Sequence, residues 1–159
     1  MKKIIIRRAK KSDIEDIIRL ADQLRKTEAP LDKTKNIKED SYLSDVYREK
    51  ELKYISSRKK IFLVAEIDKK IIGYVNGYIV ENSDIYYRDP VAYLDCLCVD
   101  KDSRKQGIGK KLIDEFSDIV NKKGAKYVKL NAFKNNTPAV NLYKKEGFEE
   151  YSIYYMKKI

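Results

Sequence analysis

The chain has 159 residues, a length that suits one domain with a full core. Lys and Arg number 35 against 25 Asp and Glu, which gives a net charge of +10, and His is absent. Without His, any proton transfer has to use Asp, Glu, Tyr, Lys, Cys or water, and a metal site built on His is excluded. We expect a single domain over residues 1–159 with a well-solvated surface.

Cysteine usage and hydropathy bear on the compartment and the partners. Cys96 and Cys98 stand one residue apart, too close for usual disulfide geometry, and free thiols indicate a reducing compartment. The N-terminus has only three consecutive apolar residues, too few for a signal peptide, and no run reaches membrane-spanning length. The lysines are spread along the chain. We therefore expect a cytoplasmic protein without a membrane, nucleic-acid or metal partner.

The N-terminal third predicts one strand and two helices. Residues 3–8 have the pattern of a short strand, and residues 12–15 form a capping box that opens a helix ending near Pro30. A second helix is expected at about 36–57. Its inward side chains are predicted to be Ile37, Leu43, Val46, Tyr47, Tyr54 and Ile55.

The middle of the chain predicts a β-hairpin. Strands at 61–67 and 71–80 are joined by the tight connection at 68–70. Gly73 and Gly77 interrupt the second strand, which suggests a close approach of another group or a bend.

Strands and helices alternate in the next part of the chain. After a polar, turn-rich segment at 81–90, a strand is expected at 91–99 and an amphipathic helix at 107–123. Gly124 stands where a left-handed C-cap residue is expected, and a short strand follows at 126–131.

The C-terminal part completes the expected element order. Thr137 and Pro138 start a helix that ends at Gly147, and residues 150–157 are predicted to form a last strand. The order βααβββαβαβ predicts an α/β fold, a mixed sheet with helices on its faces.

One segment between a strand and a helix has the features of an anion site. It consists of Arg104, Lys105, Gln106, Gly107, Ile108 and Gly109. The glycines let the backbone approach a ligand, and N–H groups at a helix start attract anions. Lys110 and Lys111 in the first turn are unfavourable by up to about 1 kcal/mol each unless an anion binds. The segment matches neither a P-loop nor the dinucleotide fingerprint.

Two motifs together carry a family resemblance. Val99 followed by Arg104-x-x-Gly107-x-Gly109 resembles the acetyl-CoA-binding signature of the GNAT superfamily of N-acetyltransferases. Residues 136–148, about thirty positions on, resemble that superfamily's second signature, and the element order also fits. The resemblance implies an acyl-CoA N-acyltransferase fold, with a mainly antiparallel central sheet and helices on both faces.

Within the superfamily, the chain is most similar to diamine and polyamine acetyltransferases. Those enzymes carry Tyr-Leu-Glu-Asp before the equivalent of Val99, where this chain has Tyr93, Leu94, Asp95 and Cys96. The resemblance implies acetyl-CoA as co-substrate, a small primary amine as acceptor, no metal and a homodimer. Because the chain is basic, acids such as Glu28, Asp32, Glu81, Asp84 and Asp89 would have to line the acceptor side.

The resemblance also assigns roles in cofactor binding and catalysis. The backbone of Leu97, Cys98 and Val99 would pair with the pantetheine arm, and residues 104–110, including Lys110, would hold the pyrophosphate. Asn136 would hydrogen-bond the cofactor's arm. Tyr143 would protonate the CoA thiolate, since a phenol with a reference pKa near 10 keeps its proton at neutral pH.

The residues leave several alternatives open. Asp95 is the candidate base, directly or through water, and Glu81 is the alternative. Tyr143 is alternatively a packed aromatic residue, Asn136 a helix N-cap, and the cysteines small core residues. The acceptor is alternatively a protein lysine or N-terminus, and a non-catalytic acyl-CoA-binding module is the remaining class.

Overall fold

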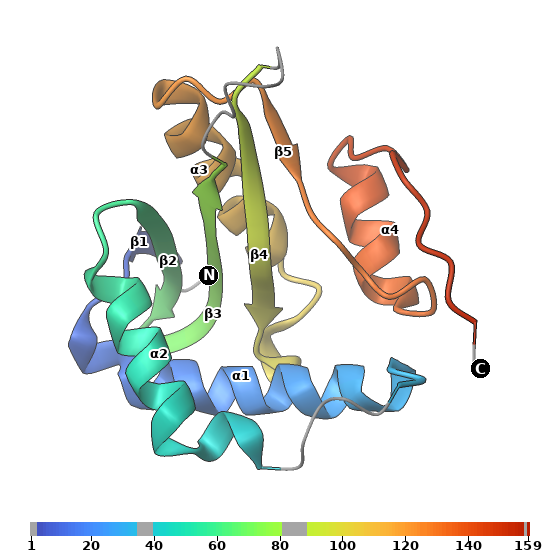
Figure 1. The fold of residues 1–159 in the computed structure, drawn as a ribbon. Coiled ribbons are helices and arrows are strands. Elements are labelled where there is room, and N and C mark those ends of the chain that lie inside the picture. The colour runs from blue at the N-terminus through green and yellow to red at the C-terminus, as the bar shows by residue number, and fades with distance from the viewer. Residues whose placement is uncertain (1–2, 35–39, 81–88, 158) are drawn as a thin grey trace.

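The computed structural model describes residues 3–34, 40–80, 89–157 and 159, and a five-stranded sheet lies at its centre (Figure 1). The strands follow one another in the order β1-β2-β3-β4-β5, antiparallel except for β5, which runs parallel to β4. This arrangement confirms the predicted mixed, mainly antiparallel sheet. The strands are β1 (Ile5–Arg8), β2 (Lys60–Ile67), β3 (Lys70–Ile79), β4 (Val91–Val99) and β5 (Tyr127–Lys129).

Helices cover both faces of the sheet, as predicted. On one face lie α1 (Ile14–Glu28) and α2 (Asp45–Ser56), and on the other lies α3 (Ile108–Lys122). A fourth helix, α4 (Thr137–Lys145), stands beside β5 (Figure 1). Within the described residues, no helix is long and apolar enough to cross a membrane. Single 3-10 turns are η1 (Lys11–Asp13), η2 (Ala29–Leu31), η3 (Ser41–Leu43) and η4 (Lys101–Ser103).

The two helical layers explain why the central strands are apolar without interruption. Leu63 of β2 belongs to the core under α3, whereas its neighbour Phe62 belongs to the core under α1. Successive side chains of a strand point to opposite faces, so a strand buried on both faces needs an apolar residue at every position. Phe116 of α3 and Leu20 of α1, both fully buried, fill the two layers.

The hairpin between β2 and β3 forms where the sequence predicts it. Asp68 and Lys69 both adopt the left-handed conformation, with φ of 49° and 66°, as two-residue hairpin turns of the I′ type require. Gly77 confirms the expected close approach. A Cβ at this position would lie 2.2 Å from the carbonyl oxygen of Tyr93 and 2.6 Å from the Phe116 ring.

The start of α1 differs in detail from the prediction. The helix begins at Ile14, within two residues of the expected start, but the predicted Ser12–Glu15 capping box is wrong. Instead the Asp13 carboxylate accepts a hydrogen bond of 2.7 Å from the N–H of Lys10. Arg7 of β1 donates two further hydrogen bonds to the same carboxylate, so a long-range ion pair fixes it.

The second helix is shorter than predicted, and only part of its predicted inward face is buried. It starts at Asp45, after η3, and residues 36–39 of the predicted helix, Ile37 among them, lie outside the described residues. Ile55 is buried, but Leu43 and Val46 are 51% and 80% exposed, which makes their predicted inward orientation wrong. Glu51 is buried in their place.

The last predicted strand, at 150–157, is wrong. No ladder forms between residues 150 and 157, and the apolar side chains of this segment are exposed: Tyr151, Ile153, Tyr154, Tyr155 and Met156. Alternating apolar residues specify a strand only when a neighbouring backbone supplies the hydrogen bonds.

The homodimer expected from the resemblance stays a prediction.

Gly77 provides a test of how tightly α3 presses on the sheet. Gly77→Ala forces a methyl group against backbone and a buried ring, so we expect it to lower the free energy of unfolding by about 3 kcal/mol. Gly124→Ala is the control, because its Cβ would meet open space and only the left-handed backbone is strained, at about 1–2 kcal/mol. Urea unfolding measures both, and a Gly77→Ala protein as stable as the wild type would contradict the packing.

Candidate active site

Strand β4 has a free edge over its C-terminal half. Its pairing with β5 ends at Tyr93, and beyond that point its one strand neighbour among the described residues is β3. The N–H of Asp100 donates to the carbonyl of Ile72 on β3 at 2.8 Å. Because backbone groups alternate along an antiparallel strand, Leu97 and Val99 direct their N–H and C=O groups to the free edge. These are residues predicted to pair with the pantetheine arm.

A β-bulge shapes the middle of this strand. Cys96 pairs with Asn76 and Leu94 pairs with Gly77, so Asp95 has no residue opposite it on β3. Asp95, the predicted base, is exposed at this point. The extra residue reverses which face the following side chains take, and this reversal turns Cys96 toward α1 and α2.

Cys98 confirms the core role considered for the cysteines. It is 2% exposed, and its thiol donates a hydrogen bond of 3.3 Å to the carbonyl of Leu20 in α1. Burial raises the pKa of this thiol to about 12. The side chain therefore stays protonated inside the core, and the N–H and C=O of Cys98 alternate with those of Leu97 and Val99 and point to β3.

The loop after β4 has the geometry of an anion site. Lys105 and Gly107 adopt left-handed conformations, with φ of 61° and 75°. The first hydrogen bond within α3 that reaches back to the loop runs from the N–H of Lys111 to the carbonyl of Gly107. The three N–H groups before it, which have no partner within the helix, belong to Ile108, Gly109 and Lys110. Together with the helix dipole they attract a phosphate.

The two glycines of the loop serve different purposes. A Cβ on Gly107 would meet nothing within 4 Å, so its positive φ is what favours glycine there. A Cβ on Gly109 would lie 3.0 Å from Leu142, so this glycine lets α4 pack against the loop.

The Lys110 ammonium reaches the C-cap of α4, at 2.8 Å from Glu146. Its backbone N–H, not its side chain, faces the predicted pyrophosphate site.

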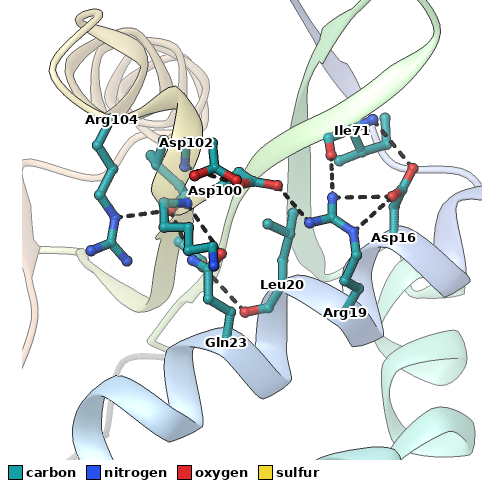
Figure 2. Close-up of polar contacts among 11 residues, drawn as sticks. Asp16, Arg19, Leu20, Gln23, Ile71, Asp100, Asp102 and Arg104 are labelled. Atoms are coloured by element: carbon teal, nitrogen blue, oxygen red, sulfur yellow. Dashed lines mark hydrogen bonds and ion pairs between the residues drawn. The ribbon is translucent and has the colours of Figure 1, made fainter.

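The cationic side chains of the loop are exposed. Arg104, Lys105 and Gln106 all face solvent, where a charged ligand would meet them. The Nε of Arg104 donates to the carbonyl of Val99 at 3.2 Å (Figure 2). This bond folds the guanidinium back over the end of β4, beside the free edge.

Asn136 and Tyr143 lie at the two ends of α4. Asn136 is the N-cap, since its Oδ1 accepts from the N–H of Ala139 at 3.4 Å, which confirms the capping interpretation. Tyr143 is half-buried, with its ring centroid 5.7 Å from that of Phe148. Burial, and then the neighbouring charges of Cys96 and Glu28, raise the pKa of Tyr143 above that of a free phenol.

Carboxylates from three elements converge on Cys96. Burial raises the pKa of its thiol, and the negative charges of Asp95, Glu51 and Glu28 raise it further, in that order. These acids come from β4, α2 and α1. Cys96 and Glu28 also act on the pKa of Tyr143 in α4, so residues of four elements influence one another electrostatically on this side of β4.

The converging acids are poorly neutralised. Among the described residues, Glu28, Glu51 and Asp95 have no Lys or Arg within ion-pair distance. Burial raises the pKa of Glu28 and of Glu51, which is only 3% exposed and hydrogen-bonded to the Tyr47 hydroxyl. The charge of Lys50 lowers the pKa of Glu51, but no described Lys or Arg forms an ion pair with any of the three acids, which favours a cationic ligand near them.

Sequence reasoning missed Glu51, although a signal was present. Tyr47, Glu51 and Ile55 are spaced four residues apart and so share one face of α2. Glu81, the alternative base, and Asp84 lie outside the described residues. Within those residues, no group of three His, Cys, Asp or Glu side chains could hold a metal ion.

Comparison with known proteins identifies the class. Residues 23–148 match the acetyltransferase (GNAT) family. Thialysine N-epsilon-acetyltransferase of Bos taurus is 30% identical over 153 residues, which covers 92% of this chain and 85% of that protein. Two other N-acetyltransferase relatives, from Xenopus laevis and Methanocaldococcus jannaschii, are matched over only 42% and 39% of their own lengths.

Solved structures agree with this class. A mutant of the BH1408 protein of Bacillus halodurans has the same fold, with a TM-score of 0.88 at 19% identity, covering 98% of this chain and 99% of that one. The PaiA N-acetyltransferase of Thermoplasma acidophilum, solved with coenzyme A, has a TM-score of 0.77 at 28% identity, covering 92% and 90%. The chain belongs to the GNAT family of acetyltransferases. Within that family its named relatives are N-acetyltransferases.

The buried Glu51 makes stability depend on pH. Its raised pKa means that the folded protein keeps this proton to higher pH than the unfolded chain. The contribution to stability is full at about pH 4 and below, where both states are largely protonated, and is lost as pH rises through the folded-state pKa. We therefore expect Glu51→Gln to raise Tm at pH 8 and to leave Tm unchanged near pH 4.

Thermal unfolding across this pH range measures the effect. Glu49→Gln, an exposed position on the same helix, is the matched control and should show no pH-dependent difference. A Glu51→Gln protein whose Tm tracks the wild type at every pH would argue against a buried carboxyl group that lacks an ion pair.

Proposed function

We propose that this protein transfers the acetyl group of acetyl-CoA to a small primary amine that is cationic in solution. One observation carries the choice of acceptor: Glu28, Glu51 and Asp95 gather without a cationic partner next to Tyr143 and the free edge of β4. An ammonium group supplies the missing positive charge, and its primary amine is also the nucleophile that the family's reaction needs.

The residues of the free edge and the loop fit the donor. The backbone groups of Leu97 and the N–H of Val99 suit the amides of the pantetheine arm, whereas the Val99 carbonyl already accepts from Gln23 and Arg104. The N–H groups of Ile108, Gly109 and Lys110 suit the pyrophosphate. Arg104 and Lys105 add positive charge at the same place. The coenzyme A bound in the related PaiA structure supports this assignment.

The acceptor nitrogen loses two protons, one from the ammonium before the attack and one after the C–N bond has formed, and the leaving sulfur gains one proton. The acceptor ammonium loses its proton to Asp95, directly or through water, and the free amine attacks the thioester carbon. A C–N bond forms, the C–S bond breaks, and the leaving thiolate takes the phenolic proton of Tyr143. The second proton of the acceptor nitrogen then passes to the Tyr143 phenolate, which leaves a neutral amide and a restored phenol, with one net proton released through Asp95. Because burial raises the pKa of Tyr143, the phenol stays protonated throughout the pH range in which amines become nucleophilic.

Names of related proteins support a small acceptor. One relative is named for thialysine, and solved neighbours at 27% identity are aminoglycoside acetyltransferases. Both names refer to small amines. A protein lysine or N-terminus is the second candidate acceptor, because Asp95 is exposed and would admit a larger partner.

An amine panel tests the proposal. Diamines, lysine, thialysine, an aminoglycoside and peptides with a free lysine or N-terminus are each mixed with acetyl-CoA, and thiol release is followed. We expect turnover with at least one small cationic amine and less with peptides. Higher kcat/KM on peptides would favour the second candidate, and coenzyme A binding without transfer to any amine would contradict catalysis.

Tyr143→Phe tests the proton donor. The variant keeps the ring that packs against Phe148 and loses only the hydroxyl, so acetyl-CoA should bind with unchanged affinity. Losing a general acid should lower kcat about 100-fold. Tyr127→Phe, on an exposed tyrosine of β5, is the control and should leave kcat unchanged. Equal turnover of the Tyr143→Phe protein and the wild type across the pH range would exclude the assigned role.

A further inference from the structure

One side chain of α1 bridges the end of β4 and the loop that follows it. The Nε2 of Gln23 donates to the carbonyl of Val99 at 3.2 Å, and its Oε1 accepts from the N–H of Lys101 at 3.1 Å (Figure 2). A side-chain amide carries a donor and an acceptor, as a peptide group does. Gln23 therefore holds this stretch of backbone much as a neighbouring strand would.

The residue between these two contacts is also fixed to α1. Arg19, one turn before Gln23, donates to the carboxylate of Asp100 at 2.5 Å and to the carbonyl of Ile71 at 2.9 Å. The same carboxylate accepts from the N–H of Asp102 at 3.2 Å (Figure 2). Burial acts to raise the pKa of Asp100, but these hydrogen bonds hold it below its usual range, so the carboxylate stays ionised.

The position of the Val99 carbonyl matters for the loop. This oxygen accepts from Gln23 and also from the Nε of Arg104, each at 3.2 Å. Arg104 is exposed, and its two terminal nitrogens are left for a ligand. The hydrogen bond from Gln23 fixes the position of the Val99 carbonyl. This carbonyl in turn fixes the position of the Arg104 guanidinium at the entrance to the anion site.

We infer that Gln23 and Arg19 are positioning residues for the cofactor, which hold the phosphate-binding loop in its binding geometry before acetyl-CoA arrives. The inference rests on the proposed function, and neither residue is assigned a contact with the cofactor. Donors that are already in place lose less entropy when the ligand binds, so fixing the loop strengthens binding. The effect is expected at the pyrophosphate and its nucleotide, since Leu97 and the N–H of Val99, which face the pantetheine arm, are held in place by the pairing of β4 with β3.

Gln23→Met tests the inference, because it keeps the length of the side chain and removes both hydrogen bonds. We expect the Kd for coenzyme A, measured by calorimetry, to rise about tenfold, the factor that corresponds to about 1.4 kcal/mol. The KM for S-acetylpantetheine, which lacks the pyrophosphate, should stay the same. In the ligand-free protein, amide hydrogen exchange over residues 104–109 should be faster than in the wild type.

Two further variants complete the experiment. Gln23→Glu keeps the acceptor for Lys101 and loses the donor to Val99, so it should also weaken coenzyme A binding. Thr27→Val on the same helix removes a side-chain hydrogen bond of 3.0 Å at an exposed position and should change neither ligand.

The outcomes separate the inference from the proposed function. Unchanged coenzyme A affinity in Gln23→Met, or equal losses for coenzyme A and S-acetylpantetheine, would overturn the positioning role. If the wild type itself does not bind coenzyme A, the proposed function fails and this inference fails with it. If the wild type binds coenzyme A and the Gln23 variants bind it equally tightly, the proposed function stands and the positioning role fails.

Discussion

Strand β4 is paired on one side along its length, but on the other side β5 accompanies it only from Val91 to Tyr93. Backbone N–H and C=O groups require partners, so an edge of this kind is open to an added strand or a strand-like ligand. The neighbouring features lie around this edge: the bulge at Asp95 partway along it, the anion site at its end, and α4 beside it (Figure 1). The proposed acetyl transfer depends on this departure of β5 from β4.

The charge distribution around the edge divides the site into two halves. The loop after β4 presents Arg104, Lys105 and helix N–H groups, which suit a phosphate, whereas Glu28, Glu51 and Asp95 gather where an amine would approach. A net charge of +10 is at first sight a poor match for a cationic acceptor. The unpaired acids resolve this difficulty locally, because close charges act more strongly than distant, screened ones.

Helix α1 connects the two halves. Arg19 and Gln23 hold the backbone between β4 and the phosphate loop, and Glu28 at the end of the same helix lies among the acceptor-side acids. A displacement of α1 would therefore affect donor and acceptor together.

The sequence was most informative where local pattern and packing agree. The bounds of β4, the left-handed Gly124 and the helix that starts at Thr137 were all predictable from turn residues and periodicity. The predicted strand at 150–157 failed because alternation does not supply a partner strand. Long-range contacts could not be predicted either, because neither the bulge at Asp95 nor the hydrogen bond from Gln23 to Val99 has a local sequence signature.

Amide hydrogen exchange with and without coenzyme A tests the central claim most directly, because it reports on the free edge and the loop in one experiment. The account predicts that coenzyme A slows exchange at the N–H groups of Leu97 and Val99 and at those of residues 106–110. It also predicts no change along the β1–β2 pairing on the far side of the sheet. Protection of the loop without protection of Leu97 and Val99 would contradict the claim that the edge of β4 receives the cofactor.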